Sequence, residues 1–291
     1  MNINEIFKDA FCTWVRYSEY EIRKEDELFN LIPAKGATAT PYNPAECIRE
    51  IALEALNIGK LVSVWNHDIE ESRRRVLQFA RKYGLLGLMV DLPLNDNFFE
   101  SGEAYLAPGF FKAGRQSTKK FMKRFFSFVD ELPKLEASDT SISTFANREP
   151  VYEYAFSNEY GEWLLWLELY FKDMYRLFRA CEDYIDETDY AKNLELRQEI
   201  MRYSDHKLRY NISAADRPEI CWEFASLKAM IDLYIVGSIT DDVAPIRECK
   251  HCGKVFYAEN ARLEFCSPQC RNKFNVYKFR RKGEAEEAGE E

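Results

Sequence analysis

The sequence predicts a mainly α-helical body followed by a small C-terminal unit made of a short hairpin and a helix. Two observations carry this prediction. Long stretches of the first 245 residues place apolar side chains at helical spacing between residues that cap helices. The last part of the chain instead contains four closely spaced cysteines and a run of basic residues. With 291 residues, 46% of them hydrophobic, the chain is long enough to bury a sizeable core.

The first predicted helices of the body are marked by their ends. Asn43 and Pro44 provide an N-cap and a first-turn proline for a helix that runs to Gly59. Asp68 caps a second helix, and Gly84 ends it. Three more helices are predicted over 159–184, 190–203 and 218–236. The stretch 159–184 is apolar over much of its circumference, so we expect it deep in the core.

Residues 91–150 show a different composition. They contain four prolines, several glycines and a polar run over 138–144. Such residues are typical of loops and turns. We therefore predict loops around a short strand at 105–106 and a helix over 117–131.

The four cysteines near the C-terminus have the spacing of a metal site. Cys249 and Cys252 are separated by two residues, and Cys266 and Cys270 follow after thirteen more. Two residues between cysteines allow one tight turn to direct both sulfurs at one point, and zinc binds four thiolates in a tetrahedron. Four cysteines leave no open coordination position, so the sequence predicts one structural zinc ion. An iron–sulfur cluster is the alternative occupant of four thiolates.

Local signals around the cysteines predict a small fold, which we call the finger (246–282). Two short strands are expected over 255–257 and 262–265, joined as a hairpin. Ser267 is a good N-cap and Pro268 a good first residue for the helix that carries Cys270. A knuckle, a hairpin and a helix with the second ligand pair make up the treble-clef arrangement. We expect the side chain of His251 to point outward and not to bind the metal.

Charge divides the chain into three parts. Residues 1–245 carry a net charge of −11, the finger carries +7, and the tail over 283–291 contains five glutamates and no basic residue. We expect a helical domain, a finger with a basic helix, and a disordered acidic tail. The basic residues after the last cysteine predict a phosphate-binding surface for DNA or RNA; they are Arg271, Lys273, Lys278, Arg280, Arg281 and Lys282.

The basic helix has two other interpretations. It could be a solvated face that keeps the finger soluble, or it could dock on the acidic body. The whole chain would then be a protein-interaction module in which zinc only orders the C-terminus. A protein partner or a homo-oligomer would fit this reading.

The finger resembles a known group at these residues. Cys-x2-Cys-Gly, an aromatic strand, Phe-Cys-Ser-x2-Cys-x-Asn and a basic Tyr-x-x-Arg end are similar to the CGNR-type zinc fingers of bacteria. Such fingers close stress-induced transcription regulators with a mainly helical N-terminal domain, so the resemblance implies regulation of transcription. The name-giving motif departs here, because Cys270 is followed by Arg271, Asn272 and Lys273. The body resembles an uncharacterised bacterial family with the same kind of finger, and this implies no activity.

Several functional classes have no support in the sequence. No stretch reaches the roughly 18 apolar residues that span a bilayer, and the first ten residues lack the apolar run of a signal peptide. Cysteines 12, 47, 181 and 221 are scattered among apolar neighbours, which is typical of buried thiols in a reducing compartment. We therefore expect a cytoplasmic protein. No motif for a catalytic nucleophile or a catalytic metal is present, so no catalytic residue is predicted.

Overall fold

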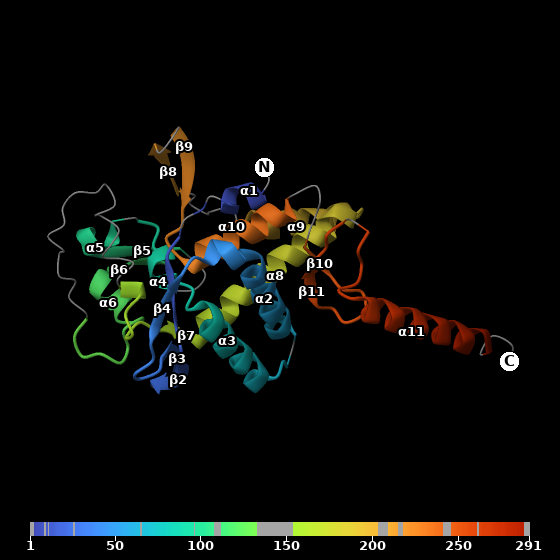
Figure 1. Cartoon of the computed structure of the whole chain (residues 1–291), viewed down its shortest axis with the longest axis horizontal. Coiled ribbons are helices and arrows are strands. Elements are labelled where there is room, and N and C mark those ends of the chain that lie inside the picture. The colour runs from blue at the N-terminus through green and yellow to red at the C-terminus, as the bar shows by residue number, and fades with distance from the viewer. Residues whose placement is uncertain are drawn as a thin grey trace.

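The computed structural model describes most of the chain; the residues outside the description are 1–2, 9, 11, 26, 65, 96, 108–111, 133–153, 203–208, 215–217, 241–245, 261 and 288–291. Helices predominate, and the strands form small antiparallel groups, so the mainly α class holds. The cysteine-rich unit lies at one end of the molecule. From it the last helix, α11 (Pro268–Glu287), projects away from the rest (Figure 1).

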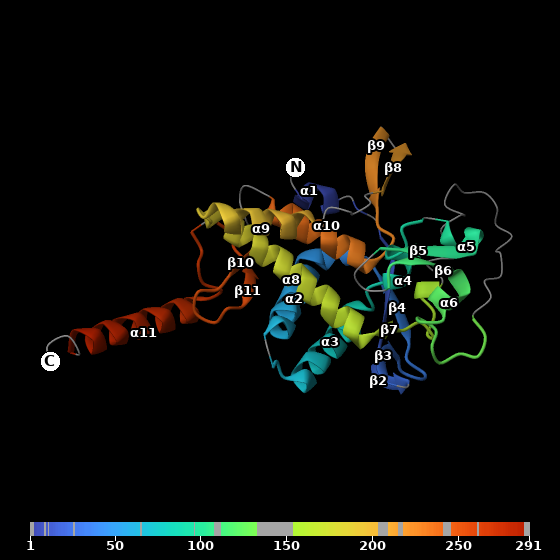
Figure 2. The same ribbon diagram turned by 180° about the vertical axis from the view of Figure 1, so that it is seen from behind.

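The core of the body is built around one long helix, α8 (Leu164–Asp186), which covers most of the expected 159–184 segment. Four helices lie around it (Figures 1 and 2): α2 (Ile48–Ser63), α3 (Ile69–Tyr83), α9 (Tyr190–Met201) and α10 (Leu227–Ile239). Helices α2 and α8 approach very closely at Gly59. A Cβ at this position would lie 1.9 Å from the carbonyl oxygen of Phe171, so only glycine allows this contact.

The helix starts follow the predicted capping residues, but the predicted end at Gly59 was wrong, because this glycine lies inside α2, which continues to Ser63. The Asn43 side chain accepts a hydrogen bond from the backbone of Ala45 at the start of the 3-10 turn η1 (Pro44–Cys47), which leads into α2. The Asp68 side chain accepts bonds from Glu70 and Glu71, and α3 ends at Gly84 with a φ of 89°. These caps satisfy backbone groups that a helix end leaves free.

The first 42 residues contain four strands that the sequence patterns did not indicate. Strand β1 (Trp14–Tyr17) pairs with β4 (Ala39–Tyr42), and β2 (Tyr20–Glu25) pairs with β3 (Leu28–Pro33), all antiparallel. The short β7 (Glu162–Trp163) adds to β3 just before α8 begins. These strands therefore cover one end of the helical core, as Figure 1 shows.

Two helix predictions were wrong. Over 117–131 the helix is only α6 (Thr118–Met122), because turns follow that bring Phe125 and Phe126 into the core. The predicted strand nearby is present as β5 (Glu103–Leu106), paired with β6 (Gly114–Ser117).

Over 218–236 the first part is a strand, β9 (Pro218–Glu223), paired with β8 (Arg209–Ala214). The helix α10 starts only after Ser226, whose side chain accepts a bond from the backbone of Ala229. The other short helices of the body are α1 (Ile3–Lys8), α4 (Leu88–Asp91) and α5 (Phe98–Ser101).

An ion network lies buried between α4, α8 and α10. The ammonium of Lys228 is 2.6 Å from a carboxylate oxygen of Asp91 and 2.6 Å from one of Asp232. The hydroxyl of Tyr170 donates to the other oxygen of Asp232 at 2.8 Å. Burial by itself lowers the pKa of Lys228, but the two carboxylates outweigh burial and raise this pKa, so the lysine stays charged.

A second buried carboxylate joins β7 to the loop before α4. Glu162 is fully buried and accepts hydrogen bonds from the backbone N–H groups of Leu86 at 2.9 Å and Leu88 at 2.7 Å. The hydroxyl of Tyr160 also donates to it, at 2.6 Å. Burial raises the pKa of Glu162, and the three donors oppose that rise.

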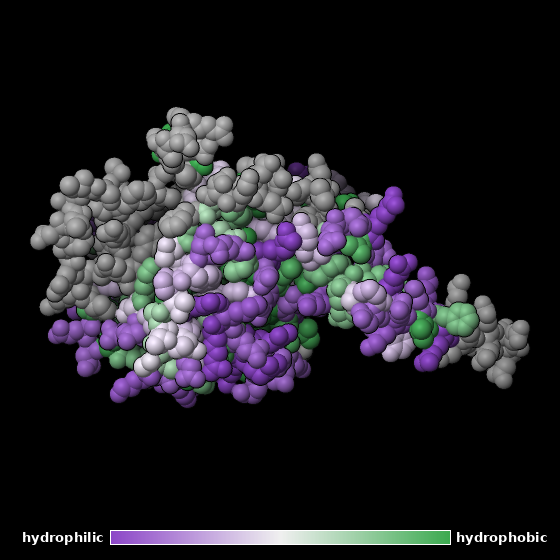
Figure 3. Space-filling model, viewed as in Figure 1, coloured by the Kyte–Doolittle hydropathy of each residue, from purple (hydrophilic) through white to green (hydrophobic). Residues whose placement is uncertain are grey.

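The surface of the described part is mixed. On the face shown in Figure 3, hydrophilic side chains gather over α3 and over the first part of α11, with hydrophobic side chains between them. Among the described residues, no helix has both the length and the apolar character needed to cross a membrane.

Candidate metal centre

The structure brings the four predicted cysteines together. The sulfur atoms of Cys249, Cys252, Cys266 and Cys270 all lie within 4.8 Å of one another. The Cys252 and Cys266 sulfurs are 3.6 Å apart, and those of Cys266 and Cys270 are 3.5 Å apart. Disulfide sulfurs would be about 2.05 Å apart. Four thiolates around one tetrahedral metal, with bonds of about 2.3 Å, lie about 3.8 Å from each other, so the cluster fits a metal ion.

The first cysteine pair lies in the turn of a hairpin. Strand β10 (Ile246–Glu248) pairs antiparallel with β11 (Val255–Tyr257), and the turn between them contains Cys249 and Cys252. The backbone N–H of Gly253 donates to the carbonyl of Cys249 at 2.8 Å, which closes the knuckle. Gly253 has a φ of 68°, a conformation that glycine adopts without strain, as its place in the sequence suggests.

The second pair is held at the start of α11. Ser267 acts as the expected N-cap, because its hydroxyl accepts a hydrogen bond from the backbone of Cys270 at 3.2 Å, and Pro268 is the first helical residue. The strand predicted over 262–265 was wrong. The side chain of Asn260 accepts from the backbone N–H of Arg262, which makes a turn instead, and β11 pairs with β10.

A small apolar cluster surrounds the sulfurs. Cys249, Phe256 and Ala258 are buried in it, and Leu263 and Phe265 pack against them. The ring of Phe265 contacts Phe274 of α11, with centroids 5.2 Å apart. The imidazole of His251 stacks on Tyr277 of α11 at 5.8 Å, and it is not among the clustered ligand atoms, as predicted. These ring contacts and the second cysteine pair connect α11 to the hairpin.

The thiols have unequal acidity. Burial opposes ionisation of Cys249, but the backbone groups of Cys252, Cys266 and His251 outweigh burial and lower its pKa to about 6. Burial and the neighbouring sulfurs raise the pKa of Cys266 to about 12.

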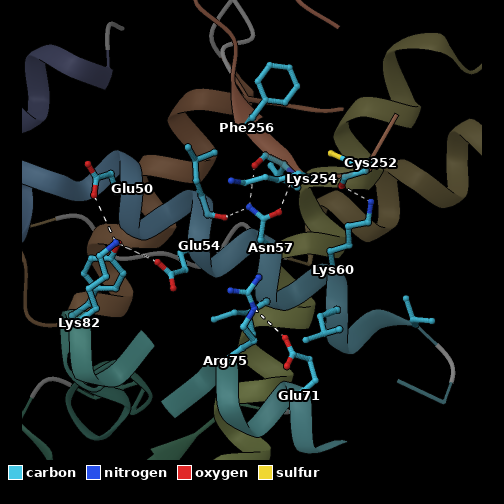
Figure 4. Close-up of a pocket in the computed structure, with 17 residues that line it drawn as sticks. Glu50, Glu54, Asn57, Lys60, Glu71, Arg75, Lys82, Cys252, Lys254 and Phe256 are labelled. Carbon is cyan, nitrogen blue, oxygen red and sulfur yellow. Dashed lines mark hydrogen bonds and ion pairs between the residues drawn. The ribbon is translucent and has the colours of Figure 1, made fainter. Parts of the chain in front are cut away.

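The hairpin is docked on the body by polar contacts from α2, which Figure 4 shows, and from α8. The side chain of Asn57 forms two hydrogen bonds of 2.9 Å with the backbone of Val255, one to its N–H and one to its carbonyl. Lys60 pairs with Glu248 and donates to the carbonyl of Gly253. The hydroxyl of Tyr175 also donates to Glu248, at 2.8 Å.

Two residues of the hairpin belong to the core of the body. Ile246 and Val255 are buried in the large hydrophobic cluster that α2, α8 and α10 share, whereas Phe256 lies in the small cluster at the sulfurs. The hairpin is therefore anchored on one side to the body and on the other to the metal centre. A cavity of about 790 Å³ lies beside this contact, between α2, α3 and the knuckle.

Replacing Asn57 by alanine is expected to destabilise the docked hairpin. Val255 is fully buried, and both of its backbone groups would lose their hydrogen bond to the Asn57 side chain. Each unsatisfied group costs about 1–3 kcal/mol, so the two together predict a loss of about 2–6 kcal/mol in urea unfolding. Asn275→Ala on the exposed side of α11 is the matched control and should change the unfolding free energy by less than about 0.5 kcal/mol. A variant as stable as the control would contradict the anchoring role of Asn57.

The basic residues predicted for phosphate contact lie on α11. The side chains of Arg271, Lys273, Lys278 and Arg280 are exposed, and among the described residues none of them forms an ion pair. Arg281 and Lys282 belong to the same helix, but their side chains lie outside the description. The helix also passes the expected boundary at Lys282 and reaches Glu287; residues 288–291 lie outside the description.

Comparison with known proteins adds no relative. A scan against protein-family models, a search of curated proteins and a search of solved structures each found no match to this chain. The resemblance to CGNR-type fingers therefore remains a prediction that rests on the cysteine spacing and the residues around it. What the structure supports is a cluster of four cysteines that could bind a metal ion.

Proposed function

We propose that the four cysteines hold one zinc ion and that the finger binds nucleic acid through α11. Zinc is the metal that four thiolates in a closed tetrahedron fit best, and such sites are structural because no position remains for a substrate. A knuckle between β10 and β11, followed by a helix that carries the second ligand pair, supports a treble-clef type of finger.

One observation carries the nucleic-acid proposal. Four cations on α11 are exposed and unpaired among the described residues, although the chain as a whole has a net charge of −9. Arg271 and Lys278 are seven residues apart and share one side of the helix, and Lys273 and Arg280 share another. The helix projects away from the body (Figure 2), so these cations are not docked on its acidic surface. Rows of free cations on a rigid helix suit a phosphate backbone.

The salt dependence of binding tests this proposal. If Arg271, Lys278 and Lys282 contact phosphates, the plot of log affinity against log salt should have a slope near −3, for about three to four contacts. Replacing all three by alanine should flatten this slope, as measured by fluorescence anisotropy with random duplex and single-stranded oligonucleotides.

The matched control removes three cations that already have carboxylate partners. Lys24, Arg74 and Arg202 each pair with a nearby glutamate, so their combined replacement by alanine gives the same net charge. We call this the paired-cation control, and it should retain the wild-type slope. Equal slopes for the α11 variant and this control would remove α11 from the proposal.

A protein-interaction module is the second candidate. Val276 and Phe279 of α11 are 50% and 80% exposed, and exposed apolar side chains on a projecting helix suit a protein partner or a second copy of the chain. Two results would favour this function over the first. Sedimentation would show oligomers that the Phe279→Asp variant no longer forms, and the wild-type protein would have no affinity for oligonucleotides.

A further inference from the structure

A second group of cations lies on the body, around α6. Residues 112–131 contain six basic residues and only two acidic ones, Asp130 and Glu131, within a body whose net charge is −11. Lys119 and Lys120 are exposed on α6, and Lys123 is exposed directly after it. The opposite side of this short helix is buried, so the three lysines face solvent together.

Several other surface cations of the body have carboxylate partners. Arg73, Arg74, Lys82 and Arg179 all lie beside carboxylates on their own or a neighbouring helix. No carboxylate of the described residues lies within ion-pair distance of Lys119, Lys120 or Lys123; only the carbonyl of Val129 accepts a bond, from Lys123. Three like charges without partners repel each other, and a bound anion relieves this repulsion. Anion binding to this surface is therefore electrostatically favourable.

Two exposed aromatic rings lie on segments near α6, one on β5, which contacts α6, and one just after α6 in the chain. Tyr105 on β5 is 41% exposed and Phe128 is 36% exposed. The guanidinium of Arg115, which also pairs with Glu103, lies 6.0 Å from the ring of Tyr105. That of Arg23, which pairs with Glu21, lies 5.5 Å from the ring of Phe128. Exposed aromatic faces beside cations are the elements with which proteins stack bases and hold the backbone of single-stranded nucleic acid.

We propose that Lys119, Lys120 and Lys123, together with Tyr105 and Phe128, form a second binding surface for single-stranded nucleic acid, here called the α6 surface. This inference rests on the proposed function in one respect, namely that the same strand also contacts α11. The two lie at opposite ends of the long axis of the molecule (Figure 1). A long strand can then contact both, and the second contact forms at a raised effective concentration.

Fluorescence anisotropy with oligothymidylates of two lengths tests the α6 surface on the full chain. A strand of about 12 nucleotides matches a single surface, and one of about 60 exceeds it several-fold. The variant Lys119→Ala, Lys120→Ala, Lys123→Ala should bind the long strand about tenfold more weakly than wild type, and its salt slope should fall by about 2, since each single-strand contact contributes about 0.7. The affinity for the short strand should fall less, because α11 still binds it.

Two further experiments distinguish nucleic acid from another polyanion as the ligand. The pair Tyr105→Leu and Phe128→Leu should weaken binding of the oligothymidylate but not of polyglutamate of equal charge. Polyglutamate that binds wild type as tightly as the oligothymidylate would overturn nucleic acid as the ligand and point to an acidic protein.

The outcomes separate this inference from the proposed function. An α6 variant that binds the long strand as tightly as the paired-cation control overturns the inference alone. An α11 variant that retains wild-type binding while the α6 variant loses it overturns the proposed role of α11 and supports the α6 surface. Unchanged metal content and melting temperature show that each variant is folded. No binding by the wild-type protein would contradict both.

Discussion

Cys252→Ser is expected to abolish tight metal binding and to release α11, while the helical body remains folded. Structural zinc supplies about 10–16 kcal/mol of apparent binding free energy in finger peptides, and a site with three thiolates loses much of it. The connection of α11 to the hairpin consists of the second cysteine pair and the ring contacts of Phe274 and Tyr277. The body has its own large core, which includes Val255 of the hairpin. Hydrogen exchange should therefore accelerate in 263–287 and stay slow in α2 and α8.

Cys181→Ser serves as the control for this variant. Cys181 is half-buried on α8 and is not part of the cysteine cluster. The Cys181→Ser variant should bind one metal ion per chain and keep the hydrogen-exchange pattern of the wild type. Equal protection of α11 in the two variants would show that the metal does not hold this helix.

Lys228→Met is expected to destabilise the body by about 3–5 kcal/mol, because it leaves the buried carboxylate of Asp232 and the half-buried one of Asp91 without their cation. Lys228 is 8% exposed and Asp232 is 2% exposed, so water cannot replace the lost ammonium. Urea unfolding followed by tryptophan fluorescence measures the loss.

A second variant separates the charge from the shape of the lysine. Combining Lys228→Met with Asp91→Asn and Asp232→Asn removes all three charges at similar volume. It should recover part of the lost stability, since a neutral group costs much less to bury than an unpaired charge. Lys24→Met, at an exposed position, should change stability by less than about 0.5 kcal/mol. A Lys228→Met variant as stable as Lys24→Met would contradict the role of the network.

Features that depend on neighbouring residues could be predicted from the sequence. The caps at Asn43, Asp68 and Ser267 act on backbone groups only two or three residues away, so the sequence contains the whole interaction. The cysteine cluster was predictable for a similar reason. The short spacing within each cysteine pair brings its two sulfurs together. Only the path of the loop that joins the two pairs could not be read from the sequence.

Features that depend on distant residues could not be predicted in this way. The pairing of β1 with β4 joins Trp14 to Tyr42, across a chain segment whose other strands pair elsewhere. The strand β9 was predicted as a helix because the spacing of its apolar residues is compatible with both a helix and a strand. Pairing with β8 makes it a strand. The bond between Asn57 and Val255 spans 198 residues, and no local pattern marks Asn57 as the anchor of the hairpin.

The network around Lys228 contains both local contacts, which the sequence indicates, and distant contacts, which it does not. Lys228 and Asp232 are four residues apart, so helical spacing could have identified this pair. Asp91 and Tyr170 join the network only through the fold. The cations around α6 were likewise visible in the composition, but only the structure shows that Lys119, Lys120 and Lys123 are exposed and that no carboxylate of the described residues pairs with them.

The most direct test of the account is the metal content of the full chain. The sulfur geometry at Cys249, Cys252, Cys266 and Cys270 predicts one zinc ion per chain in elemental analysis, and native mass spectrometry should show the same stoichiometry. The protein should be colourless. A chain purified without metal, or one that contains iron and absorbs visible light, would contradict the assignment of the cluster as a structural zinc centre.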